Sequence, residues 1–531
     1  MDIKLTALDW VVFGGYFLLL AALGWVLSQR RQGNASDFFL AGNQMPLWAV
    51  AISVMATSQS AATFLGGPDQ GFRGDLSYLA TNIGALIAAL LVMAYLIPRY
   101  YQARVTTVYG LLEQRFGAGA KRQAGSMYLF GRVFASGARL YMAAIAVAMV
   151  VFHNIEASSV VMSIGLLAFG ALAYSVVGGI RSVIYTDAFQ CAVYVVAALA
   201  VLFYLWWLIP ADSGAVLQAL RQPVDGSGSK LQLFDFALDF SSAGVFTFWS
   251  AITGFVLLNI AAFGLDQDMT QRVLTCKTAR QGAGAMLLSV LMMIPVMLLF
   301  IAIGMLLYVF YQRPDLMLQG SSELGTTFGG ETVTVFMYFV LNEMPAGLRG
   351  LVTVGVVAAA LSTMTSGLNS MASVLVTDLY RPWRQRRQPT TSELHFVRAG
   401  RVGMLLTATA LSAMAVLCFY WQQFSDMPLL AFALSVMVFS YSGLLGVYFT
   451  VLFTRRGNAS SVAAALLCGF LVPLLLQPYV LQFFGPRLSQ WDLGFTWQLC
   501  LGTLVATCVC CLGRAPAQQP SLSSEVTGES V

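Results

Sequence analysis

The chain has 531 residues, of which 58% are hydrophobic and only 10% are charged, and its mean hydropathy is +0.74. Soluble domains carry about 25% charged residues, so this composition excludes an ordinary soluble enzyme and indicates a polytopic protein embedded in the lipid bilayer. The net charge of +5 comes from residues in short loops between apolar runs, which argues against a nucleic-acid partner.

Apolar runs of about 20 residues predict thirteen transmembrane spans, because this is the helix length that crosses the hydrocarbon core. We expect one transmembrane domain over residues 1–514 and a disordered cytoplasmic tail over residues 515–531. A shorter apolar run at 333–341 predicts an external or re-entrant helix. The spans are expected near residues 8–28, 47–67, 77–98, 126–152, 158–177, 188–209, 246–264, 284–310, 350–374, 399–420, 428–453, 460–480 and 495–512.

The basic residues are unevenly distributed between alternate loops. If the N-terminus lies outside, most Lys and Arg fall in cytoplasmic segments, including Arg272, and few fall on the outer side, including Arg349. The positive-inside rule therefore predicts an external N-terminus and a cytoplasmic C-terminus in the cell (inner) membrane.

The second span, Trp48 to Gly71, is polar at its centre and ends in glycines and a proline. Irregular backbone at membrane depth is tolerated only where it faces protein or a watery cavity, and a broken helix there can present free N–H groups to an anion and free carbonyls to a cation. We expect substrate and ion to meet here. The alternative is a small-residue helix contact whose Ser and Thr bond their own turn.

Two arginines, Arg132 and Arg139, lie inside the fourth span, where a buried guanidinium predicts a function. Arg139 is nearer the middle of the span and is our choice of substrate ligand. Arg132 is closer to the cytoplasmic end, where its side chain is expected to reach toward the membrane surface.

The seventh span is also interrupted, over Leu257 to Arg272, where Gly264 and a run of polar residues close it. Five spans separate this interruption from the one in the second span. This spacing is compatible with two inverted repeats of five helices, over about 47–209 and 246–453.

Hydroxyl groups form two adjacent clusters on the ninth span. Ser362, Thr365 and Ser366 share one helix face, and Ala359, Ser362 and Thr363 share the next. Such oxygens suit Na⁺, although hydroxyls in membrane helices also bond their own backbone.

Asp187, at the start of the sixth predicted span, has two interpretations: an N-cap of the helix, or a carboxylate that holds a second cation.

Five stretches together resemble the sodium:solute symporter family: A-T-S-Q-S-A-A-T-F at 56–64, V-T-T-V-Y-G-L-L-E-Q-R-F at 105–116, G-G-I-R-S-V-I-Y-T-D-A-F-Q at 178–190, N-I-A-A-F-G-L-D-Q-D-M-T-Q-R at 259–272 and the long run at 358–380. The resemblance implies an all-α protein with the leucine-transporter type of fold, thirteen spans and two inverted five-helix repeats. It also implies a first sodium site from the carbonyls of Ala56, Gln59 and Ala359 with the hydroxyls of Ser362 and Thr363, and a second from Asp187, Thr365 and Ser366.

For the substrate, the chain looks similar to sialic acid transporters at Ser58, Ser60 and Thr63, with an arginine such as Arg139 for a carboxylate. Asn82 stands where those relatives have glutamine. Ala262 and Phe263 stand where the sugar branch has a tyrosine gate, so Phe263 is expected to line the substrate site without favouring a sugar.

These observations predict a monomeric, Na⁺-coupled importer of a small carboxylate-bearing solute, such as sialic acid or a monocarboxylate, with no other cofactor. The alternatives are a sugar, amino acid or vitamin substrate, such as proline or pantothenate, and more remotely a membrane sensor or a proton-coupled carrier. An embedded enzyme is disfavoured, because His153 and His395 both lie at span ends and no catalytic cluster surrounds them.

Overall fold

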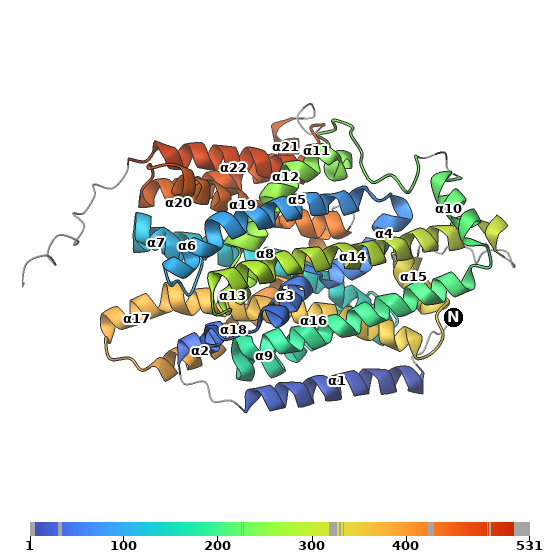
Figure 1. The fold of residues 1–531 in the computed structure, drawn as a ribbon, viewed down its shortest axis with the longest axis horizontal. Helices are drawn as coiled ribbons and strands as arrows, with labels where there is room; N and C mark the ends of the chain where they lie inside the picture. Colours follow the sequence, from blue (N-terminus) through green and yellow to red (C-terminus); the bar gives the residue numbers. More distant parts are fainter. Residues whose placement is uncertain are drawn as a thin grey trace, which may run out of the picture.

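The computed structural model describes residues 6–29, 34–224, 226, 228–317, 327–328, 331–332, 334–422, 429–485, 487 and 490–514. The tail predicted at 515–531 lies outside these residues. Long helices run side by side along one direction (Figure 1). The first half of the chain forms α1 (Ala7–Ser28), α2 (Ala35–Leu40), η1 (Ala41–Asn43), α3 (Leu47–Ser58), α4 (Ala61–Arg73), α5 (Ser77–Leu91), η2 (Val92–Leu96), α6 (Ile97–Gln102), α7 (Gly110–Phe116), α8 (Ala118–Val151), α9 (Ala157–Leu208) and α10 (Ser213–Arg221).

The second half of the chain is also helical, apart from one short β-hairpin. Its elements are η3 (Ala243–Phe246), α11 (Phe248–Ile252), α12 (Gly254–Ile260), η4 (Ala261–Leu265), α13 (Gln267–Leu274), α14 (Ala279–Gln312), η5 (Pro314–Leu316), β1 (Thr327–Phe328), β2 (Glu331–Thr332), α15 (Val335–Asn342), α16 (Leu348–Val374), η6 (Leu375–Tyr380), α17 (Arg381–Arg387), α18 (Glu393–Gln422), α19 (Leu429–Phe453), α20 (Ala459–Leu475), α21 (Pro478–Leu481), η7 (Gln482–Phe484) and α22 (Phe495–Leu512). The antiparallel hairpin pairs β1 with β2. Helix α15 confirms the short helix predicted at 333–341.

Among the described residues, eleven helices are long and apolar enough to cross a membrane, and the bent pair α3 and α4 makes a twelfth. The 17-residue helix α20 lies at the position of the predicted twelfth span but is shorter than a full span. The predicted positions therefore agree with the structure, while the number of full-length spans is eleven or twelve instead of thirteen.

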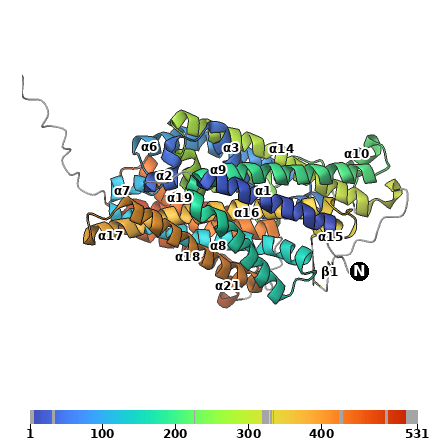
Figure 2. The ribbon, with the colours of Figure 1, turned by 90° about the horizontal axis from the view of Figure 1, so that it is seen from below.

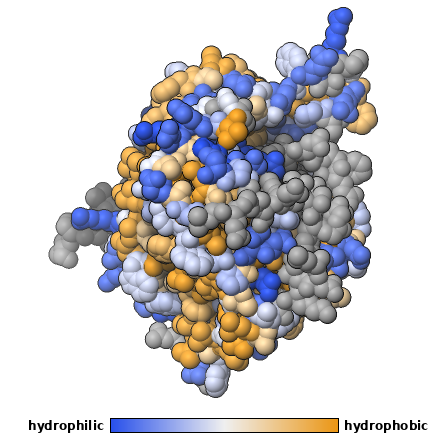
Figure 3. Space-filling view, turned by 90° about the vertical axis from the view of Figure 1, so that its right-hand side faces the viewer, coloured by the Kyte–Doolittle hydropathy of each residue, from blue (hydrophilic) through white to orange (hydrophobic). Residues whose placement is uncertain are grey.

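The two ends of the bundle differ in the segments that they carry. Helices α10 and α15 lie near the N-terminus at one end, and α7 and α17 lie at the other (Figures 1 and 2). The face at the N-terminal end carries many hydrophilic residues, with hydrophobic ones along its margin (Figure 3). This pattern fits an aqueous face at the end of a bundle whose sides contact lipid.

Three breaks in the helices position the site. Helices α3 and α4 meet at 62°, because Gln59 and Ser60 have extended backbone between them. Helix α9 is kinked at Gly179, whose φ of 60° favours glycine. In the seventh predicted span, the π-helical turn η4 ends at Asp266, whose extended backbone separates it from α13. Both interruptions predicted in the second and seventh spans are therefore confirmed.

Helix α16 lies at the centre of the bundle and is almost entirely buried. Its small residues let neighbouring helices approach closely: a Cβ added at Gly355 would lie 2.8 Å from the Ala197 Cβ of α9 and 3.2 Å from the Phe64 ring of α4. The hydroxyl-rich face of α16 is thus held against both α9 and the broken span.

Helix α1 lies at the edge of the bundle and contacts α9 and α16 (Figure 1). Its Asp9 carboxylate accepts bonds from the backbone N–H groups of Gly347 and Gly350, at 2.8 Å each, and from Arg349 Nη2 at 3.1 Å. Asp9 therefore caps the N-terminus of α16 and attaches α1 to it. Arg349, counted above as an outer loop residue, is a buried member of this contact.

Asp9→Ala is expected to lower the unfolding free energy by about 2–4 kcal/mol, because it leaves Arg349 and two backbone donors without their buried acceptor. The measurement is thermal unfolding of the purified protein in detergent. Asp69→Ala is the matched control, since among the described residues Asp69 forms an ion pair with Arg73 alone, whose side chain is 62% exposed. Equal melting temperatures for the two variants would contradict the capping role of Asp9.

Candidate ion and substrate site

The break between α3 and α4 releases backbone oxygens toward the centre of the protein. The helical bonding of α3 ends with Gln59 N donating to the Met55 carbonyl, and that of α4 begins with Phe64 N donating to Ser60. Among the described residues, no backbone N–H donates to the Ala56 or Gln59 carbonyl, and the Gln59 Oε1 atom is also without a donor. Free oxygens at a buried break are what a hard cation requires.

The other half of the predicted first sodium site lies on α16, which contacts α3. The Thr363 hydroxyl donates to the Ala359 carbonyl at 3.0 Å, and the Ser362 hydroxyl donates to Asp187 Oδ1 at 2.8 Å. Both residues are buried. The five residues predicted for this site thus come from two facing helices, and their oxygen atoms match the chemistry of Na⁺.

Asp187 lies inside the part of α9 that starts at Gly178, so its interpretation as an N-cap is wrong. The helix already begins nine residues earlier, and the Thr186 hydroxyl bonds its own turn. The fully buried Asp187 carboxylate instead accepts hydrogen bonds from Ser53 of α3, at 2.5 Å, and Ser362 of α16. This carboxylate therefore joins three helices at the predicted ion sites.

The remaining predicted ligands of the second sodium, Thr365 and Ser366, lie on α16, which packs against α9, the helix of Asp187. The Thr365 hydroxyl bonds the Ser362 carbonyl and accepts from Tyr174 at 3.4 Å, and the Ser366 hydroxyl contacts Thr57 at 3.2 Å. Local backbone bonding therefore does not account for all the contacts of these hydroxyls on α16, because both also contact side chains of other helices.

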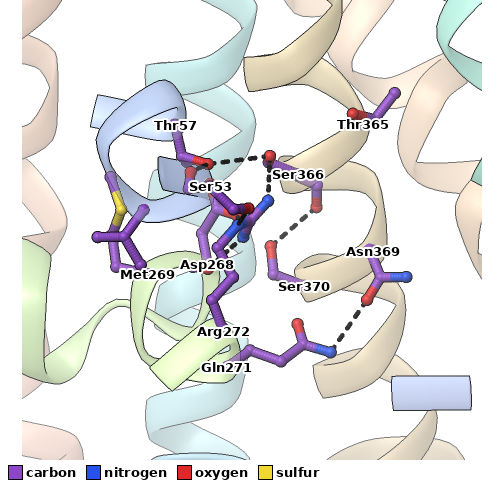
Figure 4. A network of polar contacts seen from close by, with 12 residues as sticks. Ser53, Thr57, Asp268, Met269, Gln271, Arg272, Thr365, Ser366, Asn369 and Ser370 are labelled. Atoms are coloured by element: carbon purple, nitrogen blue, oxygen red, sulfur yellow. Dashed lines mark hydrogen bonds and ion pairs between the residues drawn. The ribbon is translucent and has the colours of Figure 1, made fainter. Parts of the chain in front are cut away.

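Arg272 was not predicted to take part in the site, yet its guanidinium lies within it (Figure 4). The residue, which the topology assigned to a cytoplasmic segment, is fully buried. It donates to Asp187 at 3.2 Å, to Asp268 at 2.9 Å and to the Ser53 hydroxyl at 2.8 Å, and it also contacts the Ser366 hydroxyl. A positive charge of the protein therefore occupies ligands of the predicted second sodium.

Arg132 belongs to the same network and does not reach toward the membrane surface as predicted. It is 3% exposed, pairs with Asp266 at 2.9 Å, and forms a second ion pair with Asp268. The Tyr441 hydroxyl also donates to Asp266, at 2.6 Å. The carboxylates at the start of α13 compensate the charge of this arginine, which therefore needs no anionic substrate for that purpose, although its Nε has no acceptor among the described residues.

Arg139 lies two helical turns beyond Arg132 on α8 and has a different environment. Its Nη2 lies 3.1 Å from the Met437 sulfur of α19, and it forms no ion pair with a carboxylate among the described residues. Thioether sulfur is a weak acceptor. Arg139 is therefore the fourth-span arginine whose charge is available to an anionic solute.

The other predicted substrate residues lie in the two broken spans and, in the case of Asn82, on the helix α5. Ser58 bonds its own turn at Val54, as the local alternative predicted, whereas the Ser60 and Thr63 hydroxyls form no hydrogen bond with the described residues. The N-terminus of α4, at Ser60 to Thr63, presents the positive end of a 13-residue helix. The other two predicted residues are both buried: Asn82 lies on α5 beside Met297, and Phe263 lies in η4.

Two features of the sequence indicate this charged network: the spacing of Asp268 and Arg272, and the need of an intramembrane arginine for an acidic partner. Asp268 and Arg272 are four residues apart at the start of one helix, the spacing of an ion pair. An intramembrane arginine also requires a partner, and Asp266 and Asp268 were the acidic residues within the other broken span.

Two broken spans, carbonyl oxygens free to bind a cation and buried arginines are the features of an ion-coupled membrane carrier. The sodium:solute symporter family model matches residues 38–469, so the chain belongs to this family of sodium-coupled transporters and is not an enzyme. The family resemblance inferred from the five sequence stretches is confirmed.

Similar proteins agree with this assignment. The chain is 25% identical over 520 residues to the sodium/sialic acid symporter NanT of Aliivibrio fischeri, covering 97% of this chain and 95% of that protein. It is 27% identical over 384 residues to human sodium-coupled monocarboxylate transporter 2, covering 72% and 59% of the two chains. The solved structure of a Na⁺-coupled sialic acid symporter, in a substrate-bound outward-open state, matches with a TM-score of 0.78 at 21% identity, over 96% of this chain and 99% of that one. The predicted leucine-transporter type of fold is confirmed.

Proposed function

We propose that this protein imports a small carboxylate-bearing solute, such as sialic acid or a monocarboxylate, together with Na⁺. The observation that carries the proposal is the half-buried Arg139 guanidinium, which lies between α8 and α19 without a carboxylate partner among the described residues. A carboxylate on the solute would supply that partner in a bidentate, charge-assisted contact. The names of the similar sialic acid and monocarboxylate transporters support the same class of solute.

The substrate would bind between the break of α3 and α4 and the arginine. Ser60 and Thr63 have hydroxyls free to bond the solute, and the N-terminus of α4 favours negative charge. Ser58, Asn82 and Phe263 would complete the walls of this site. Because α8 contacts α4, the arginine and the helix terminus belong to adjacent helices.

Two sodium ions would couple to the solute. The first would bind the carbonyls of Ala56, Gln59 and Ala359 with the hydroxyls of Ser362 and Thr363, and would hold the broken span in place. The second would bind Asp187, Thr365 and Ser366. With a monoanion, two sodium ions carry one net charge inward, worth about 2.3 kcal/mol per 100 mV in addition to the sodium gradient.

The orientation that we propose is an external N-terminus and a cytoplasmic C-terminus in the inner cell membrane, with the monomer as the transporting unit. The distribution of Lys and Arg between the loops supports this orientation.

Uptake into proteoliposomes tests the function directly. The panel contains N-acetylneuraminate, lactate, pantothenate, proline and galactose, each with an inward Na⁺ gradient and with choline in place of Na⁺. We expect one acidic solute to accumulate only with Na⁺. Accumulation of galactose or proline instead would overturn the carboxylate assignment, and uptake driven equally well by a proton gradient would overturn the sodium sites.

Thr363→Ala is expected to raise the Na⁺ concentration for half-maximal uptake about tenfold or more, because each oxygen on a buried cation contributes roughly 1.5–3 kcal/mol. The measurement is uptake against Na⁺ concentration. Thr353→Ala on the same buried helix is the control, since in the part of the chain that the structure describes the Thr353 hydroxyl bonds just the Arg349 carbonyl of its own turn. An unchanged Na⁺ dependence in Thr363→Ala would exclude this residue from the first sodium site.

A further inference from the structure

The guanidinium of Arg272 has three nitrogens with separate partners. Its Nη1 donates to the Asp268 carbonyl at 2.6 Å and to the Asp268 carboxylate at 2.9 Å, and its Nε donates to the Ser53 hydroxyl at 2.8 Å. Its Nη2 donates to Asp187 and to the Ser366 hydroxyl. One edge of the side chain is thus anchored on its own helix and α3, while the other covers Asp187 and Ser366, two of the three proposed ligands of the second sodium; Figure 4 shows the contact with Ser366.

Sodium and this nitrogen cannot use the same oxygens at once. A cation bound between Asp187 and Ser366 needs the lone pairs to which Nη2 now donates, and two positive charges at that distance in a buried site repel each other strongly. The two states are therefore alternatives: the Asp187 carboxylate faces either the guanidinium or the metal ion.

The charges of the surrounding network leave room for this exchange. Three buried carboxylates, Asp187, Asp266 and Asp268, are linked through two buried guanidiniums, Arg132 and Arg272, by ion pairs. Arg139, two turns from Arg132 on the same helix, brings the positive charges of this region to three, equal to the number of carboxylates. When a solute carboxylate neutralises Arg139, the network needs one more monovalent cation to be neutral again.

We propose that Arg272 is a tethered cation that competes with sodium at Asp187 and so positions the second site. Sodium binding displaces the guanidinium from Asp187 and Ser366, while the Asp268 carboxylate on the same helix continues to compensate its charge. Sodium release lets the guanidinium return, so the Asp187 carboxylate is compensated in the empty carrier too. This inference rests on the proposed function of Asp187, Thr365 and Ser366 as sodium ligands.

The test is a Na⁺ titration of the purified full-length protein in detergent, followed by thermal unfolding with choline at constant ionic strength. The part of the Na⁺-dependent rise in melting temperature that is lost in Asp187→Asn reports binding at the second sodium site. Arg272→Gln removes the competing charge and is expected to lower the apparent Kd for Na⁺ at this site about tenfold or more.

Arg272→Lys separates competition from general electrostatics, because it keeps the charge but lacks the planar fork that reaches Asp268 and Asp187 together. Competition predicts tighter Na⁺ binding in this variant too, whereas a distant charge effect predicts an unchanged Kd. Should Arg272→Gln fail to fold, Arg272→Lys alone decides. Arg349→Lys, a buried arginine paired with Asp9, is the control and should bind Na⁺ as the wild type does.

The possible outcomes separate the two proposals. A wild-type protein whose stability does not respond to Na⁺ would overturn the proposed function. A wild-type response that is unaltered by Asp187→Asn, or an Arg272→Lys protein with an unchanged or weakened Kd for Na⁺, would overturn the tethered-cation proposal while sodium coupling stands.

Discussion

Arg139→Gln is expected to reduce Na⁺-driven uptake of the carboxylate-bearing solute by about 100-fold or more while leaving the protein folded. Truncating one partner of a buried, charge-assisted contact costs roughly 2–5 kcal/mol of binding. The substitution leaves no carboxylate unpaired, because the guanidinium contacts the Met437 sulfur and no described carboxylate. The measurements are initial uptake rates in proteoliposomes and the melting temperature of the same preparation.

Arg139→Lys serves as the graded control. Lysine keeps the charge but cannot form the planar two-point contact, so uptake between that of the wild type and that of Arg139→Gln is expected. Wild-type uptake of the acid by Arg139→Gln would show that another group binds the carboxylate.

Arg132→Gln is expected to lower the unfolding free energy by about 3–5 kcal/mol, the cost of leaving a buried charge without its partner. Asp266 and Asp268, which are 1% and 0% exposed, would both lose this guanidinium. Thermal unfolding in detergent measures the effect. Adding Asp266→Asn to Arg132→Gln should recover part of the stability, because it removes one orphaned charge.

A surface pair provides the matched control for that experiment. Arg313→Gln removes an arginine paired with Asp315, whose side chain is 56% exposed, and is expected to change the melting temperature little. An Arg132→Gln protein with wild-type stability and no uptake would contradict our assignment and place Arg132 in the substrate site.

The positions of the spans and of both breaks could be predicted from the sequence, because the physics behind them is local. The thickness of hydrocarbon sets the length of an apolar run. Polar residues with glycine in the middle of such a run mark a break, as at Gln59 and Asp266. Helix α20 falls short of a full span because its helical part ends at Leu475, before the end of the apolar run.

The partners of the buried charges could not be predicted in the same way. Arg132 and Asp268 are 136 residues apart in sequence, and nothing local to either residue shows that they meet. Thr186 and Asp187 have the composition of an N-cap, but the helix around them had already started at Gly178, so their side chains point into the core. Depth alone favoured Arg139 over Arg132; the ion pairs of Arg132 give a physical reason for the same choice.

The attachment of α1 through Asp9 bears on the order in which the chain assembles. Asp9 is made well before its partners, because the Gly347 and Gly350 donors follow it about 340 residues later in the chain. At about 5–20 residues per second, that interval is on the order of tens of seconds. During it, α1 resides in the bilayer with its acidic end at the interface, and docking completes only when α16 has been inserted. The Asp9 carboxylate therefore links a helix that is inserted early to one that completes the bundle late.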